Sequence, residues 1–190
     1  MGNAMQGDIE IAAVLAFWFD HLSAEQWFEA DAEVDAACRD RFSSLYERLA
    51  SQASKLPTAW LGAADGSLAA VIVLDQFPRN IFRGSPRAFE SDKAALAIAE
   101  QAIDHGFDGQ LEPPRRVCLY MPFQHSEDTA VQARSVELFA SLGMPEPLEW
   151  AKRHKAIVDR FGRFPHRNAI LGRPSTDEER AFLKTPSSSF

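Results

Sequence analysis

Only one segment of this 190-residue chain has the character of a buried strand. It is the continuous apolar run Val71-Ile72-Val73-Leu74, a pattern that is equally compatible with a buried helix. A strand inside a domain needs a neighbouring strand to satisfy its backbone hydrogen bonds, and the sequence contains no second segment of this kind. We therefore predict that the run is helical and that the chain is all-α.

The remainder of the chain divides into helical segments separated by proline and glycine. The predicted helices are 9–19 (capped by Asp8), a long amphipathic helix at 24–53, a short one opened by Pro57 and ended by a turn at 64–66, 67–75, 85–105, one from Pro114, 128–142, 147–161, and one at about 175–184 opened by a capping box. This pattern predicts a single domain (1–190), an irregular array of eight or nine helices with an ordered core at about 8–184 and a flexible tail at 185–190.

The charge and the composition exclude several kinds of binding partner and of environment. The net charge is -7, which disfavours binding to nucleic acid or to an anionic membrane. No apolar run approaches the roughly 20 residues that span a bilayer, and the first residues lack a hydrophobic signal segment. The two cysteines, Cys38 and Cys118, are far apart and suggest neither a disulfide framework nor a thiolate metal site. We expect a cytoplasmic protein.

Three segments are dense in polar groups: 75–80 (DQFPRN), 120–127 (YMPFQHSE) and 163–168 (RFPHRN). In each of them proline or glycine is expected to interrupt a helix, which frees backbone amides and places polar side chains at a helix end. Their surroundings of Phe, Pro and Met would partly desolvate these groups, so they must pair with one another or with a ligand.

These segments also carry a resemblance. The strings 71–84 (VIVLDQFPRNIFRG), 119–127 (LYMPFQHSE) and 160–173 (RFGRFPHRNAILGR), with the early Phe17-Trp18-Phe19, resemble a bacterial family catalogued as domain of unknown function 924. The resemblance runs from Val14 to Leu183. It implies an irregular all-helical array similar to tetratricopeptide repeats, and it implies no established activity and no catalytic roles.

The residues themselves favour a binding module. Guanidinium groups fit carboxylate and phosphate oxygens in a bidentate manner, which suits a small anionic ligand or the terminal carboxylate of a peptide. The ligand-binding residues that we predict are Asp75, Arg79, Asn80, Arg163, Arg167 and Asn168.

Two alternatives stay open. One is an enzyme that uses His125, Glu127 and His166 for acid–base chemistry, with or without the assistance of a metal ion, because a buried carboxylate beside histidine tunes a proton acceptor. The spacing of these residues matches no established metal motif, so we assign no metal ligands and no cofactor. The other alternative is a protein–protein interaction domain in which the polar segments only hold the fold together. The sequence does not specify a substrate, a protein partner or an oligomeric state.

Overall fold

The computed structural model describes residues 2–27, 29–186 and 188, and within them all regular secondary structure is helical. The predicted all-α class is therefore confirmed. The α-helices are α1 (Gly2–Leu15), α2 (Ala32–Ser51), α3 (Thr58–Leu61), α4 (Ala64–Val71), α5 (Phe77–Ile81), α6 (Asp92–Asp104), α7 (Pro113–His125), α8 (Thr129–Ser141), α9 (Pro145–Phe161) and α10 (Asp177–Phe182). Shorter segments are the π-helical η1 (Ala16–His21) and η3 (Ile72–Gln76) and the 3₁₀-helical η2 (Ala53–Lys55), η4 (Pro86–Phe89), η5 (Asp108–Gln110) and η6 (Pro165–Arg167).

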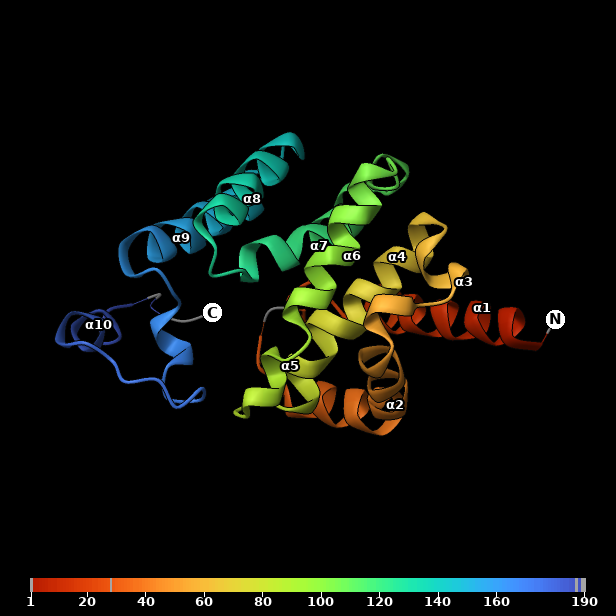
Figure 1. Cartoon of the computed structure of the whole chain (residues 1–190), viewed down its shortest axis with the longest axis horizontal. Helices are drawn as coiled ribbons and strands as arrows, with labels where there is room; N and C mark the ends of the chain where they lie inside the picture. Colours follow the sequence, from red (N-terminus) through yellow and green to blue (C-terminus); the bar gives the residue numbers. More distant parts are fainter. Residues whose placement is uncertain (1, 28, 187, 189–190) are drawn as a thin grey trace.

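A central helix runs through the middle of the fold. It consists of α4, η3 and α5, which follow one another directly along the chain (Figure 1). Every residue from 66 to 78 is buried, as expected of a helix that is apolar around most of its circumference. The strand-like run at 71–74 is helical because neighbouring helices cover it on all sides.

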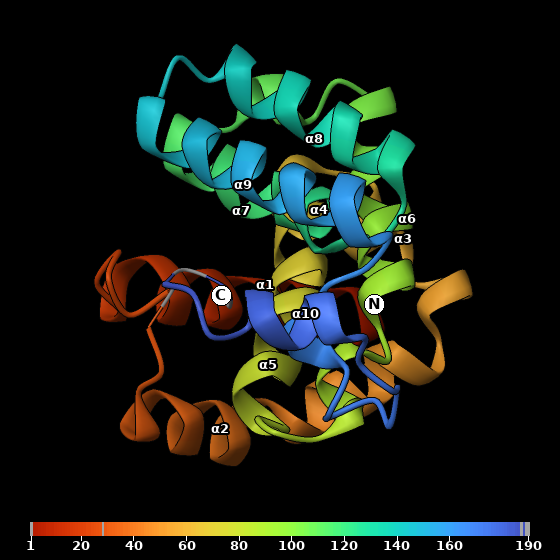
Figure 2. The ribbon, with the colours of Figure 1, turned by 90° about the vertical axis from the view of Figure 1, so that its left-hand side faces the viewer.

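The other helices pack around this centre. Contacts join α4 to α1, α6 and α7, and α5 to α2, while α8 and α9 pack against each other and against α7. Figure 2 shows α7, α8 and α9 as a layer on one side of the central helix, with α2 on the other. Large aromatic side chains fill the core, with Phe77 of the central helix in contact with Phe17, Trp18 and Phe42.

The central helix continues through Pro78 because a side chain replaces the missing backbone hydrogen bond. Proline has no N–H, so the carbonyl four residues earlier loses its usual helical donor. That carbonyl belongs to Leu74, and it accepts a hydrogen bond of 2.5 Å from the buried hydroxyl of Ser91. The Phe-Pro pair therefore does not interrupt the helix, contrary to our prediction. Pro122 likewise lies inside α7.

Several predicted helix limits were wrong. The first helix begins at Gly2, so Asp8 lies within it and does not cap it. The long helix begins at Ala32, eight residues later than predicted, because the carboxylate of Asp31 accepts from the amides of Glu33 and Val34 and caps it there.

Other limits differ in the middle of the chain. The turn predicted at 64–66 is the first turn of α4. The helix predicted at 85–105 is divided into η4 and α6 at Ser91, whose hydroxyl is bonded to the central helix. The helix predicted from Pro147 begins at Pro145, where proline occupies the first turn.

The C-terminal segment, residues 162–186, follows a left-handed Gly162 at the end of α9. Phe164 packs with Ile157 and Val158 in a small apolar cluster of its own, and a capping box between Thr176 and Glu179 starts α10. Of the tail predicted at 185–190, residues 187, 189 and 190 lie outside the described residues. None of the helices in the described part of the chain is long and apolar enough to cross a membrane.

We predict that Gly66→Ala destabilises the fold. A β-carbon at this position would lie 2.3 Å from the carbonyl oxygen of Ala59 and 3.1 Å from that of Trp60, so α3 and α4 would have to separate. We expect a loss of about 1–3 kcal/mol in the free energy of unfolding, measured with urea. Helix propensity alone would predict a gain of up to about 1 kcal/mol, so a more stable variant would contradict this account. Gly109→Ala, which meets no atom within 4 Å, is the control.

Candidate functional site: an arginine–histidine cluster

The site begins at Asp75, a fully buried carboxylate in η3. Its Oδ1 accepts a hydrogen bond of 2.8 Å from Nδ1 of His125 and lies 3.3 Å from Nη1 of Arg79, and the amide of Gln76 donates to Oδ2. Burial alone would raise the pKa of Asp75, but the charge of Arg79 and the bond from His125 lower it below its usual value. Asp75 is therefore ionised and held by donors from two helices.

A second carboxylate, Asp92 at the start of α6, lies between two arginines. Arg79 binds it through both terminal nitrogens, with Nη1 2.9 Å from Oδ1 and Nη2 3.1 Å from Oδ2. Nη1 of Arg167, in η6, lies 3.3 Å from the same Oδ2. The carboxylate of Asp92 thus accepts from two guanidinium groups whose residues are 88 positions apart in the sequence.

Arg167 is buried but only partly paired. Its side chain is 8% exposed, and its guanidinium lies 4.7 Å from the ring centroids of both Phe89 and Phe164. A guanidinium has five N–H donors, and the bond to Asp92 is the one hydrogen bond that the guanidinium of Arg167 makes to the described residues. Its Nε is buried without an acceptor in the same part of the chain. Burial and the charge of Arg79 lower the pKa of Arg167 to about 10, so it stays protonated at neutral pH.

Three histidines complete the cluster. The ring of His125 lies 6.4 Å from that of His154 on α9, and the ring of Phe164 lies 5.7 Å from His154 and 5.6 Å from His166. Burial and nearby positive charges lower the pKa of His154 to about 3 and that of His166 to about 4. These imidazoles are neutral at physiological pH. We call Asp75, Arg79, Asp92, His125, His154, His166 and Arg167 the arginine–histidine cluster.

The cluster combines cationic donors with neutral acceptors. Its partly exposed members are Arg79, Asp92 and His125, whose side chains are 19, 17 and 12% exposed, and His166. Two guanidiniums sharing one carboxylate can bind an added anion, and neutral imidazoles can accept a hydrogen bond or a proton. Among the residues that the structure describes, no group of three histidine, cysteine or acidic side chains is arranged to hold a metal ion.

The structure brings only some of the predicted site residues together. Asp75, Arg79, His125, His166 and Arg167 lie in the cluster, although they come from all three polar segments of the sequence.

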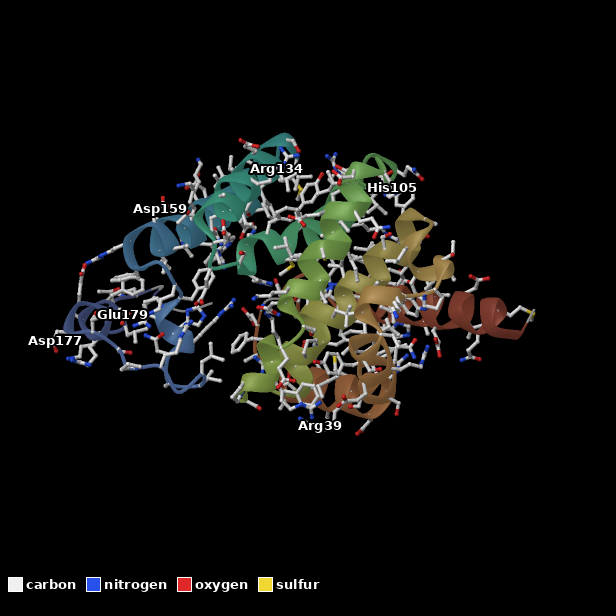
Figure 3. The ribbon with its side chains drawn as sticks, viewed as in Figure 1. Arg39, His105, Arg134, Asp159, Asp177 and Glu179 are labelled. Atoms are coloured by element: carbon white, nitrogen blue, oxygen red, sulfur yellow. The ribbon has the colours of Figure 1, made fainter. Side chains whose placement is uncertain are left out.

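The other four predicted residues have partners elsewhere: Asn80, Arg163, Glu127 and Asn168. Asn80 donates to Asp35 of α2, on another side of the central helix. Arg163 donates to both carboxylate oxygens of Glu179, inside the C-terminal segment. Figure 3 shows Glu179 within that segment, and its exposed fraction is 2%.

Glu127 anchors the C-terminal segment to the body of the protein, while Asn168 makes its bonds within that segment. Glu127 accepts two hydrogen bonds from Arg173, at 2.7 and 2.9 Å, and one of 2.7 Å from the amide of Phe164. Asn168 accepts from the same Arg173 and donates to Ser175. With its carboxylate occupied in this way, Glu127 is not a partner of His125; Asp75 is.

Sequence reasoning missed Asp92 and left His154 out of the site. Asp92 is one of many acidic residues in a first helical turn, where the helix dipole favours negative charge, so its local sequence gives no signal. His154 lies on the apolar face of an amphipathic helix and reads as a core position. Both are recognised only by their distance to Arg167 or His125 in space.

Comparison with known proteins places the chain in a family. The model of a family of bacterial proteins of unknown function, DUF924, matches residues 14–187. The chain belongs to the DUF924 family. It is also similar to the solved structure of a protein of unknown function, ATU0120 from Agrobacterium tumefaciens. The two are 41% identical, the match covers 92% of this chain and 96% of that one, and the TM-score is 0.85. No curated protein matches the chain. Neither relative carries an assigned activity.

We predict that the stability of this DUF924 protein falls between pH 7 and pH 5. The folded-state pKa of His154, about 3, lies below the ordinary value of 6.5, so the unfolded chain binds more protons in this range. The contribution of His154 to the free energy of unfolding is therefore fully present above about pH 6.5. It decreases on acidification, by roughly 2 kcal/mol at pH 5 for a histidine shifted this far.

Urea unfolding at pH 7, 6 and 5 measures this dependence. His154→Asn keeps a donor to the carbonyl of Trp150, which Nδ1 of His154 contacts at 2.8 Å, and should reduce the slope against pH. His105→Asn, an exposed histidine on the outer surface in Figure 3, should leave the slope unchanged. Equal slopes in the wild type and His154→Asn would contradict the prediction. The lowered pKa values of His125 and His166 add to the slope in both proteins, so the difference between the two slopes reports His154, and those of Asp75 and Glu127 act mainly below about pH 4.

Proposed function

We propose that this DUF924 protein is a binding module that holds a small anionic ligand at Arg79 and Arg167. The observation that supports it best is the state of Arg167, a buried cation with one hydrogen bond to the described residues and with its Nε lacking an acceptor there. Leaving such a donor unpaired normally destabilises a fold by about 1–3 kcal/mol. An anion with two oxygens would give Arg167 its second partner and would lie beside the guanidinium of Arg79.

The surroundings of the two arginines support a small ligand. Cζ of Arg167 lies 4.7 Å from the ring centroids of both Phe89 and Phe164, so aromatic side chains replace part of the water around its guanidinium. In such a partly desolvated setting a bidentate arginine–carboxylate pair is stronger than at the surface. The low exposure of Arg167 favours a small acid over the end of a peptide, which remains the second ligand class of this proposal.

Arg79 and Arg167 are not equivalent in this proposal. Removing Arg79 would leave the buried carboxylate of Asp75 short of its main counter-charge, which typically destabilises a protein by about 3–5 kcal/mol. A variant at Arg79 would thus lose both the fold and the ligand. Arg167 touches no fully buried carboxylate, so its removal separates binding from folding.

We predict that Arg167→Met keeps the fold and loses the ligand. Replacing a partly paired buried charge by an apolar side chain should leave the free energy of unfolding unchanged within about 1 kcal/mol, or raise it. In a thermal-shift screen of small carboxylates and phosphates, a ligand at about 100 times its Kd should raise the midpoint of the wild type by about 5–10 °C and leave that of Arg167→Met unchanged.

Arg134→Met is the matched control, since Arg134 pairs with Glu137 on the exposed face of α8 (Figure 3). It should retain the full ligand shift. If Arg167→Met unfolds, the cluster is structural and the function lies with a protein partner. If it keeps the shift, the anion binds elsewhere.

An acid–base enzyme is the second candidate, and the pairing of His125 with Asp75 favours it. A carboxylate that accepts from Nδ1 leaves Nε2 as a base, an arrangement used by many hydrolases. Turnover of a bound acid that disappears in His125→Asn would support this reading.

Two further attributes belong to the proposal. A tetratricopeptide-like arrangement is supported by the successive packing of α6, α7, α8 and α9. A cytoplasmic location is supported by Cys38 and Cys118, both free, buried thiols whose pKa values burial raises to about 12.

A further inference from the structure

We propose that the anion held at Arg79 and Arg167 is a small hydroxy acid, whose hydroxyl group donates a hydrogen bond to Nε2 of His125. This inference rests on the proposed anion site and names the class of its ligand. It makes His125 the residue that distinguishes a hydroxy acid from the corresponding acid without a hydroxyl.

The hydrogen-bonding role of His125 follows from its partner. The carboxylate of Asp75 is ionised and can only accept, so Nδ1 of His125 carries the hydrogen of the 2.8 Å bond between them. The imidazole is neutral, because burial and the charge of Arg79 lower its pKa below the ordinary value. Nε2 is then a bare acceptor on the side of the ring away from Asp75. It makes no hydrogen bond to the residues that the structure describes, and the side chain is 12% exposed.

His154 is a second neutral imidazole beside His125. Its Nδ1 lies 2.8 Å from the backbone carbonyl of Trp150, which can only accept, so the ring carries its hydrogen on Nδ1. The two rings lie 6.4 Å apart. His154 therefore adds no positive charge beside Nε2 of His125, which attracts a hydrogen donor, while the arginine side of the cluster attracts anions.

The two sides meet at Asp75. Nη1 of Arg79 and Nδ1 of His125 both approach the same atom, Oδ1 of Asp75, at 3.3 and 2.8 Å. The ligand that joins them in this proposal is a small acid whose carboxylate lies at the guanidiniums and whose hydroxyl, one or two carbons away, passes round the edge of the imidazole to Nε2. The carboxylates of the cluster, Asp75 and Asp92, are already bound by arginines, so an ammonium group would meet two cations without a counter-charge. This favours a hydroxyl over an amine.

The backbone around His125 is fixed for such a role. Gln132 of α8 is fully buried, and its amide nitrogen donates to the carbonyls of Gln124 and Ser126, each at 2.7 Å. These two residues flank His125. With Asp75 holding the ring and Gln132 holding the chain on either side, Nε2 has a defined direction. This preorganisation permits discrimination between ligands that differ by one group.

The test compares acids in matched pairs by isothermal titration calorimetry: lactate with propionate, and malate with succinate. We expect the wild type to bind the hydroxy acid of at least one pair about tenfold more tightly than its partner, the effect of one added hydrogen bond. In His125→Asn the amide can still donate to Asp75, but Nε2 is gone. The two members of that pair should then bind within about twofold of each other. His105→Asn is the control and should keep the difference.

Each outcome bears on one of the two proposals. Equal affinity for both members of each pair in the wild type, with binding lost in Arg167→Met, would keep the anion site and overturn the hydroxyl inference. Tighter binding of alanine than of lactate would overturn it as well. No binding of any acid to the wild type would overturn both.

A second measurement covers the case in which His125→Asn does not fold. Nitrogen NMR of the wild-type histidines should show His125 with its hydrogen on Nδ1. The hydroxy acid should shift its Nε2 resonance, and the acid without a hydroxyl should leave it in place. A hydrogen on Nε2 in the ligand-free protein would overturn the inference.

Discussion

The ionised side chain of Asp75 governs the architecture around the candidate site. A carboxylate inside a helix that is buried on all sides would be destabilised by several kcal/mol without partners. Arg79, one turn later on the same helix, and His125, at the end of α7, supply them. Their positions in turn fix where Asp92 and Arg167 can lie. The polar cluster is thus an extension of the core, and the requirement to neutralise one charge links four helical elements.

The C-terminal segment is attached by polar contacts more than by apolar ones. Its apolar contact with α9, where Phe164 packs against Ile157 and Val158, is small and separate from the main core. Its polar links to the body include the bonds from Arg173 and the amide of Phe164 to Glu127 and the bond from Arg167 to Asp92. Such contacts depend on geometry and on charge, so the segment that supplies Arg167 and His166 is held by interactions that a bound anion could strengthen directly.

The helices were predictable where caps and periodicity agree, as at α8, which Asp128 caps and Gly143 ends. Helices that depend on a residue distant in sequence were not predictable. The hydroxyl of Ser91 replaces a bond that Pro78 cannot make, and no local sequence pattern predicts this contact. The same holds for the site. The three polar segments indicated Arg79, His125 and Arg167, but Asp92 lies 75 residues from Arg167 and looks like any acid in a first helical turn.

The bond between Arg167 and Asp92 has a consequence for biosynthesis. Chains fold from the amino terminus as they leave the ribosome, and the helices that surround the central helix all precede residue 126. Much of the core can therefore assemble before the residues that follow 126 are made. The cluster cannot, since two of its members arrive with residues 166 and 167 and the anchor at Arg173 follows them. A nascent chain that has not reached residue 167 presents Asp92 and His125 without Arg167, so the complete cluster forms only after Arg167 and the anchor at Arg173 have been added.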